Sequence, residues 1–189
     1  MILNLNYFSL IVKVFFIFLF LINLSCSQKI KKEKILKGDN IELQMIESYN
    51  EGKKALDEGD TLLAAKKFNE AELLYPQSEW APRSALMAAY SYYSSDYYSD
   101  AIYELRRYIE TYPQNPEKAY AHYLLAISYY EIIVDEKKDI GPLINSQKEF
   151  KYIVKAYPNT DFAIDAEFKL SLIYDILASK EMYLARYYM

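Results

Sequence analysis

Side chains that commonly carry out catalysis are scarce in this chain. It has one Cys, Cys26, and one His, His122. A single Cys cannot form an internal disulfide, and a single His offers no pair for a metal site or for a Cys-His relay built from separate parts. The sequence also lacks a Gly-rich phosphate loop and a nucleophile with a neighbouring base. We therefore expect a protein that is not an enzyme and that uses no metal and no cofactor.

The other polar candidates are expected to have structural roles. His122 is interpreted as a partly exposed structural His near the start of a helix. Glu104, Arg106, Arg107 and Glu110 are expected to form the solvated face of one helix, although a partner protein could bind them. The net charge of -4 disfavours a general nucleic-acid binder, so no nucleic-acid partner is expected.

Cys26 stands where a lipid anchor could be attached. An apolar run at 14–22 is preceded by Lys13 and is too short to span a membrane, so residues 1–25 are predicted to be a secretory signal peptide. With Ser25 before Cys26, the site resembles the lipobox of bacterial lipoproteins, although Asn23 replaces the usual aliphatic residue. Cys26 would then become the lipidated first residue of the mature chain. A short signal anchor and an incidental Cys are the alternatives.

A basic segment follows this Cys. Residues 26–38 are predicted to be a solvated tether, and a patch that touches anionic lipid head groups is the alternative. Ser27 replaces the Asp that marks inner-membrane retention in enteric lipoproteins, which favours the outer membrane. Against the single acidic residue Glu33, the segment contains Lys29, Lys31, Lys32, Lys34 and Lys37.

Tyr is the residue type best supplied for binding. The chain has 21 Tyr against one Trp. A Tyr ring is rigid, apolar along its body and polar at its tip, and it is enriched at protein interfaces. Which of these Tyr side chains can contact a ligand depends on the helices that carry them.

Three Tyr-Pro dipeptides recur in similar surroundings, which resemble tetratricopeptide repeats. Counting back from Pro76, Ala71, Phe68, Ala64 and Gly52 occupy the characteristic positions of that repeat. Small residues let two helices approach closely, the aromatic ring fills the space between them, and Pro ends the second helix. The other two dipeptides, at 112–113 and 157–158, are preceded at the same offsets by Tyr108, Leu105, Ala101 and Ala89, and by Ile153, Phe150 and Ser146.

One unit is longer than the others. Pro76 and Pro113 are 37 residues apart, and Pro113 and Pro158 are 45 apart, against about 34 in the usual repeat. The surplus is an eight-residue insertion near 135–142, charged and ending in Gly-Pro, which is predicted to be a loop.

The predicted fold is an all-α tetratricopeptide solenoid over residues 39–189, with about three repeats and part of a fourth. Only 4 Gly and 6 Pro are present, too few for the turns of an all-β fold. Helices are expected at about 40–58, 61–75, 81–95, 98–112, 117–134, 144–157 and 162–178, with a last one starting near Lys180.

The end of the sequence suggests that the array is incomplete. The last predicted helix would present an aromatic face with nothing after it to cover it, whereas solenoids normally end in a polar cap. We expect a fragment or a shortened gene, with an aromatic cap or a dimer contact as alternatives. The face consists of Tyr183, Leu184, Tyr187 and Tyr188.

The first helix of each repeat is expected to line a binding groove. Many of its Tyr residues could instead pack between units or lie on wetted surface. Phe168 and Leu172 belong to the partial fourth unit. The predicted groove residues are Tyr49, Lys53, Arg83, Leu86, Tyr90, Tyr93, Tyr120, Tyr123, Ile127 and Tyr130.

Three stretches near the end make a family resemblance more specific. Tyr-Pro-Asn-Thr-Asp-Phe-Ala at 157–163 is followed by Leu-Ala-Ser-Lys-Glu-Met at 177–182 and by Ala-Arg-Tyr-Tyr at 185–188. Together with the Cys and the repeats, they resemble the YfiO family of tetratricopeptide lipoproteins, over about residues 20–189.

The resemblance implies a non-enzymatic part of the outer-membrane β-barrel assembly (BAM) complex. It would be lipid-anchored on the periplasmic face and would bind BamA, other BAM subunits and unfolded outer-membrane β-barrel proteins. The C-terminal strands of those substrates end in an aromatic residue, which would suit the groove, and Arg83 or Lys53 could pair with the carboxylate. The alternatives are a different envelope scaffold, which coordinates cell-wall synthesis or division, and, remotely, an enzyme.

Overall fold

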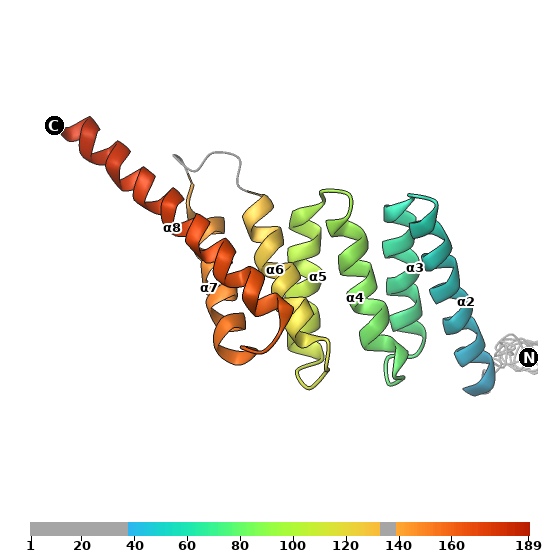
Figure 1. Ribbon diagram of the computed structural model, residues 1–189. Helices are drawn as coiled ribbons and strands as arrows, with labels where there is room; N and C mark the ends of the chain where they lie inside the picture. Colours follow the sequence, from blue (N-terminus) through green and yellow to red (C-terminus); the bar gives the residue numbers. More distant parts are fainter. Residues whose placement is uncertain (1–37, 133–138) are drawn as a thin grey trace, which may run out of the picture. The chain divides into compact units, whose positions relative to one another are not determined.

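The computed structural model describes residues 38–132 and 139–189, and this part of the chain is all helical. Successive helices run up and down, each beside the next (Figure 1). The predicted all-α fold is confirmed, and most predicted helix ends lie within a few residues of the observed ones. The seven helices in the described residues are α2 (Gly38–Asp57), α3 (Thr61–Leu74), α4 (Trp80–Tyr93), α5 (Tyr98–Thr111), α6 (Lys118–Glu131), α7 (Gly141–Ala156) and α8 (Asp161–Tyr188).

The helices pair into tetratricopeptide-like units. Each helix packs mainly on the one before and the one after it, and α4 also touches α6, as α6 touches α8. The first helices of the units, α2, α4, α6 and α8, are called A helices here, and α3, α5 and α7 are called B helices. The described residues thus contain three A/B pairs and an unpaired fourth A helix, in agreement with the predicted three repeats and part of a fourth.

The repeat positions form the cores of the units. Gly52 on α2 packs against the ring of Phe68, and a Cβ at Gly52 would lie 2.9 Å from Phe68 Cδ1. The small residue at this position is therefore required by the close approach of α2 and α3. The equivalent positions in the three B helices are all fully buried: Ala64, Phe68 and Ala71, then Ala101, Leu105 and Tyr108, then Ser146, Phe150 and Ile153.

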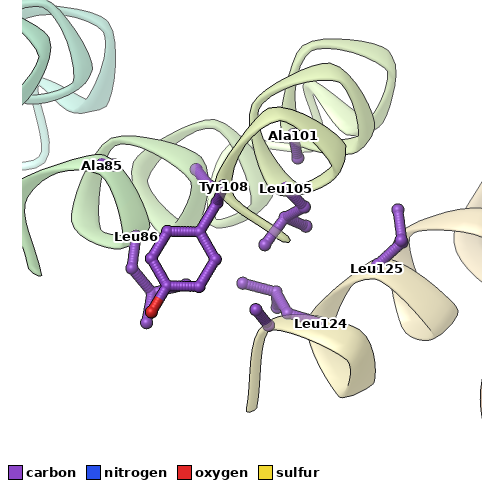
Figure 2. Close-up of a cluster of buried hydrophobic side chains, with 9 residues drawn as sticks. Ala85, Leu86, Ala101, Leu105, Tyr108, Leu124 and Leu125 are labelled. Atoms are coloured by element: carbon purple, nitrogen blue, oxygen red, sulfur yellow. The ribbon is translucent and has the colours of Figure 1, made fainter. Parts of the chain in front are cut away.

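The cores extend across unit boundaries. Figure 2 shows Leu105 and Tyr108 of α5 pointing into the space between α4 and α6, where they meet Leu86 and Leu124. Each buried side chain of this kind contributes roughly 1.5–3 kcal/mol. Burial raises the pKa of Tyr108 to about 12, and among the described residues its hydroxyl has no hydrogen-bond partner.

The end of the chain differs from the prediction. We expected two helices, one ending near 178 and another starting near Lys180, but α8 runs unbroken from Asp161 to Tyr188. Thr160 caps its start, since Oγ1 accepts a hydrogen bond from the Ala163 amide at 3.2 Å. The predicted break came from the repeat register, and no Gly or Pro lies within α8 to interrupt the helix.

The inserted segment of the third unit is only partly described. Residues 133–138 lie outside the described residues, and Gly141 and Pro142 belong to the first turn of α7 rather than to a loop. Pro is favoured there because its fixed φ suits a helix start and the first turn needs no amide donor. Helix α7 therefore starts three residues earlier than predicted.

The amino-terminal predictions concern residues that the structure does not describe. The signal peptide, Cys26 and nearly all of the tether lie within residues 1–37. Within residues 38–132 and 139–189, no helix is both long enough and apolar enough to cross a membrane.

Candidate peptide-binding groove

Four of the predicted groove residues meet in one cleft between α4 and α6. Arg83, Leu86 and Tyr90 come from α4, and Tyr120 comes from α6. The cleft has a volume of about 570 Å³, which is within the usual range for ligand sites. Its remaining lining residues are Glu79, Met87, Asn115 and Glu117.

The floor of the cleft is apolar and firmly held. Leu86 is 7% exposed and belongs to the core shared by α4, α5 and α6, and the half-buried Tyr90 and Tyr120 pack against the same core. Burial raises the pKa of Tyr120 to about 12. Its hydroxyl is therefore neutral near pH 7 and can donate a hydrogen bond to a ligand.

Arg83 is positioned by two aromatic rings. Its Cζ lies 5.7 Å from the ring centre of Tyr49 and 5.6 Å from that of Trp80. Both distances are within the range of cation–π attraction. Within the described residues no carboxylate forms an ion pair with Arg83, so its guanidinium is available to an anionic group at the cleft.

The structure gives Tyr49 a packing role. It is 4% exposed, and its ring meets Phe68 and Trp80 edge-on, with centroids 5.3 and 5.1 Å away. Tyr49 therefore joins α2, α3 and α4, and its ring lies against the guanidinium of Arg83. Lys53, one turn further along α2, is exposed and does not line the cleft.

The other predicted groove residues of α6 pack against α8. Tyr123 donates a hydrogen bond to Asp165 Oδ2 at 2.7 Å, and its ring centre lies 5.1 Å from that of Phe162. The ring of Tyr130 is covered by Lys169, whose Nζ is 5.3 Å from the centroid. The burial of Tyr123 and its bond to Asp165 raise its pKa.

Three further predicted positions have separate places. Ile127 belongs to the apolar core between α6, α7 and α8. Tyr93 packs against Tyr98 of α5, with ring centroids 5.8 Å apart, and burial raises its pKa. Phe168, on α8, is 60% exposed. The structure thus gathers four of the ten predicted residues in the cleft and puts the others in packing contacts or elsewhere on the surface.

The two acidic residues of the cleft were not predicted. Glu79 is the N-cap residue of α4 and Glu117 that of α6, and neither side chain makes a capping hydrogen bond. Within the described residues neither carboxylate has an ion-pair partner. A sequence signal was available, because Glu79 and Glu117 stand three and four residues after the Pro that closes the preceding unit.

The B helices of the first two units are joined by a partly buried ionic network. Arg107 donates from Nη1 and Nη2 to the two oxygens of Glu72, at 2.8 and 2.6 Å, and from Nε to Glu104 Oε2 at 2.8 Å. The Tyr112 hydroxyl also donates to Glu72 Oε1, at 2.6 Å. The bonds to Glu72, and then those to Glu104, raise the pKa of Arg107.

This network corrects the expected solvated face of α5. Glu72 is 5% exposed, and burying a carboxylate is costly unless it has charged and hydrogen-bonding partners. Arg107 and Tyr112 supply these partners from the next unit, and Glu104 bonds Arg107 from the same helix, whereas Arg106 and Glu110 are exposed. The spacing of charges along one helix could not indicate a contact with a residue 35 positions earlier.

His122 is more buried than expected. It is 9% exposed, its Nδ1 lies 2.8 Å from Glu149 Oε2, and its ring centre is 4.4 Å from that of Tyr152. These contacts fix α6 against α7, so the expected structural role is supported, but the expected partial exposure is wrong. Among the described residues no group of three or more His, Cys, Asp or Glu side chains could hold a metal ion.

Stacked helix pairs with a cleft on the A-helix side define a tetratricopeptide-like scaffold of the kind that binds other proteins. Comparison with known families makes this more specific, because the model of the family described as YfiO, outer membrane lipoprotein, matches residues 41–189. The chain belongs to this family.

Three curated relatives carry the name outer membrane protein assembly factor BamD. The protein from Caulobacter vibrioides is 38% identical over 165 residues, covering 87% of this chain and 53% of the relative. The one from Rickettsia prowazekii is 38% identical over 141 residues, covering 75% and 56%. The one from Neisseria gonorrhoeae is 29% identical over 151 residues, covering 75% and 57%. The chain therefore spans about half the length of these relatives.

Proposed function

We propose that this protein is a non-enzymatic lipoprotein of the outer-membrane β-barrel assembly complex. The observation that carries the proposal is the family match over residues 41–189, together with relatives named outer membrane protein assembly factor at up to 38% identity. A helical-repeat scaffold suits such a role, because each unit offers surface to a partner without needing a catalytic centre.

The cleft and the neighbouring A-helix surface are proposed to bind the C-terminal signals of unfolded β-barrel proteins. Leu86, Tyr90 and Tyr120 provide an apolar floor for an aromatic side chain, and Arg83 provides a guanidinium for a carboxylate. Guanidinium–carboxylate pairs are among the stronger polar contacts in recognition sites. Lys53, which is exposed on α2, would contact a longer peptide.

BamA and other subunits of the complex are proposed as stable partners. Exposed surface on the B helices is available to them, including Tyr103, which is 67% exposed, and the neighbouring Arg106. Tyr and Arg are both enriched at protein interfaces.

A lipid at Cys26 is proposed to hold the protein on the periplasmic face of the outer membrane. The apolar run at 14–22 and the basic residues after Cys26 support this arrangement. Residues 26–38 would then act as the tether between the membrane and the helical units.

The test is a pull-down from gently solubilised membranes, with the full chain expressed behind its own amino-terminal segment. We expect mass spectrometry to identify BamA, and we expect Cys26→Ala to reduce its recovery by weakening attachment to the membrane. Ser25→Thr, which leaves the Cys in place, is the matched control.

Two results would contradict the proposal. Recovery of cell-wall or division proteins without BamA would indicate a different envelope scaffold. Equal recovery of BamA with the wild type and with Cys26→Ala would remove the lipid anchor from the proposal and leave the partnership intact.

A further inference from the structure

The cleft between α4 and α6 carries more negative than positive charge. Glu79 and Glu117 line it together with a single cation, Arg83. Within the described residues none of these three side chains has an ion-pair partner. An anionic ligand would therefore gain one favourable interaction with Arg83 and meet two carboxylates.

Both carboxylates are free to interact with a ligand. Glu79 and Glu117 are exposed N-cap residues whose side chains make no bond to their own helices. The amide of Glu117 instead donates to Asn115 Oδ1 at 2.9 Å, which fixes the backbone at this point.

Glu117 differs from the residues at the same position of the other repeats, which are aromatic. Four residues after the closing Pro of each unit stand Trp80, Glu117 and Phe162. Trp80 packs on Tyr49, and Phe162 packs on Tyr120 and Tyr123, with ring centroids 5.1 to 5.7 Å apart. Only the middle position has a carboxylate, and there the A-helix side is open as the cleft.

We propose that this cleft selects peptide segments in which an aromatic side chain is flanked by Lys or Arg. The aromatic side chain would lie on Leu86, Tyr90 and Tyr120, and the flanking cation would meet Glu79 and Glu117. Arg83, held by the rings of Tyr49 and Trp80, would donate hydrogen bonds to one acidic group of the same segment. This inference rests on the proposed function, since it takes polypeptide as the ligand, and it adds a preference of charge.

The test measures fluorescence anisotropy of short labelled peptides with the full chain in mild detergent. Each peptide has an amidated end and one Phe, flanked by two Lys, two Ser or two Glu. We expect the Lys-flanked peptide to bind about tenfold more tightly than the Glu-flanked one at low salt, with the Ser-flanked one between them. The ratio should fall as ionic strength rises, because exposed charges are screened.

Variants assign the preference to the cleft. Glu79→Gln or Glu117→Gln should lower the Lys-to-Glu ratio to about threefold, the double variant should bring it close to one, and Arg83→Gln should widen it. Glu110→Gln is the matched control, because it removes one exposed negative charge from α5, outside the cleft.

Each remaining outcome overturns the inference. Equal affinity for the three peptides, no binding of any of them, or a ratio that survives in the double variant would each do so. These failures are distinguishable from failure of the proposed function. Recovery of BamA without a charge preference removes this inference alone, whereas a charge preference without BamA removes the proposed function alone.

Discussion

The junction between α4 and α6 and the junction between α6 and α8 are built from the same repeat positions with opposite results. Phe162 fills the A-helix side of the second junction, where its ring lies 5.7 Å from Tyr120 and 5.1 Å from Tyr123. Glu117 occupies the equivalent position of the first junction, and a cleft of about 570 Å³ lies there. At this repeat position, an aromatic ring therefore accompanies the filled junction and a carboxylate accompanies the cleft.

The units on either side of the cleft are still held together by contacts of the B helices. Behind the cleft, Leu105 and Tyr108 of α5 are fully buried against α4 and α6. One unit earlier, Arg107 and Glu72 join α5 to α3. At this junction the B helix therefore supplies buried contacts while the A-helix side holds the cleft.

Removing the ring from the sealed junction should have the largest effect on stability. Phe162→Ala loses the contacts with Tyr120 and Tyr123 and leaves a gap, so we expect a loss of about 2–3 kcal/mol. The free energy of unfolding from urea titration measures it. Phe168→Ala is the control, because Phe168 is 60% exposed on the same helix. Equal losses for the two variants would refute the sealing role of Phe162.

Adding a ring to the open junction should close the cleft. Glu117→Phe reproduces the residue of the sealed junction and removes one carboxylate, so we expect at least about tenfold weaker binding of the Lys-flanked peptide. The stability should change by less than about 1 kcal/mol, because the new ring contacts offset the lost interaction with the helix N-terminus. Peptide anisotropy and urea titration measure the two effects. Unchanged peptide affinity would argue against this cleft as the site.

Breaking the polar contact of the sealed junction should have a smaller effect. Tyr123→Phe keeps the ring against Phe162 but removes the donor to Asp165, which is 2.7 Å away. We expect a loss of about 1 kcal/mol. The double variant with Asp165→Asn should lose little more than the single variant, which a double-mutant cycle can check. Fully additive losses would show that the two side chains do not interact.

The smallest test concerns the hydroxyl of Tyr108 in the core behind the cleft, which has no hydrogen-bond partner within residues 38–132 and 139–189. Tyr108 is fully buried, and its raised pKa of about 12 means that the folded state favours the neutral phenol. Its contribution to stability is therefore complete below pH 10, the ordinary Tyr pKa, and is lost as pH rises from about 10 to 12.

Tyr108→Phe should reduce that alkaline loss and should leave stability at pH 7 unchanged or raise it by up to about 1 kcal/mol, because no hydrogen bond is lost. Circular dichroism during titration from pH 9 to 12 can follow this. Other Tyr residues also contribute in this range, so only the difference from the wild type is informative. A larger alkaline loss in the variant would contradict the assignment.

The repeat positions were predictable because they depend on residues close in sequence. Gly52, Phe68 and Pro76 alone indicate a close helix pair and its end, and the structure buries Phe68 against Gly52. The unbroken α8 was not predicted, because a repeat register indicates where a unit should end and not whether a helix breaker is present. The sequence also could not distinguish Tyr residues that line the cleft from Tyr residues that pack between helices. Tyr90 and Tyr120 line the cleft and Tyr49 and Tyr123 pack, yet all four have the same residue type.

Contacts between units could not be predicted from the sequence, because they join residues that lie far apart along the chain. The pairing of Arg107 with Glu72 spans 35 residues, and no periodicity within one helix indicates it. The significance of Glu117 appears only when Trp80 and Phe162 are aligned with it and their rings are seen in contact. The predictions for Cys26 and residues 1–37 stay predictions.

The packing of each helix on its neighbours in sequence affects how fast the protein can fold. Because each helix rests mainly on its immediate neighbours, the contacts that stabilise a unit join residues close along the chain. Helical proteins rich in such local contacts fold in roughly microseconds to milliseconds. A chain that emerges amino-terminus first can close each unit onto the preceding one while later residues are still being made.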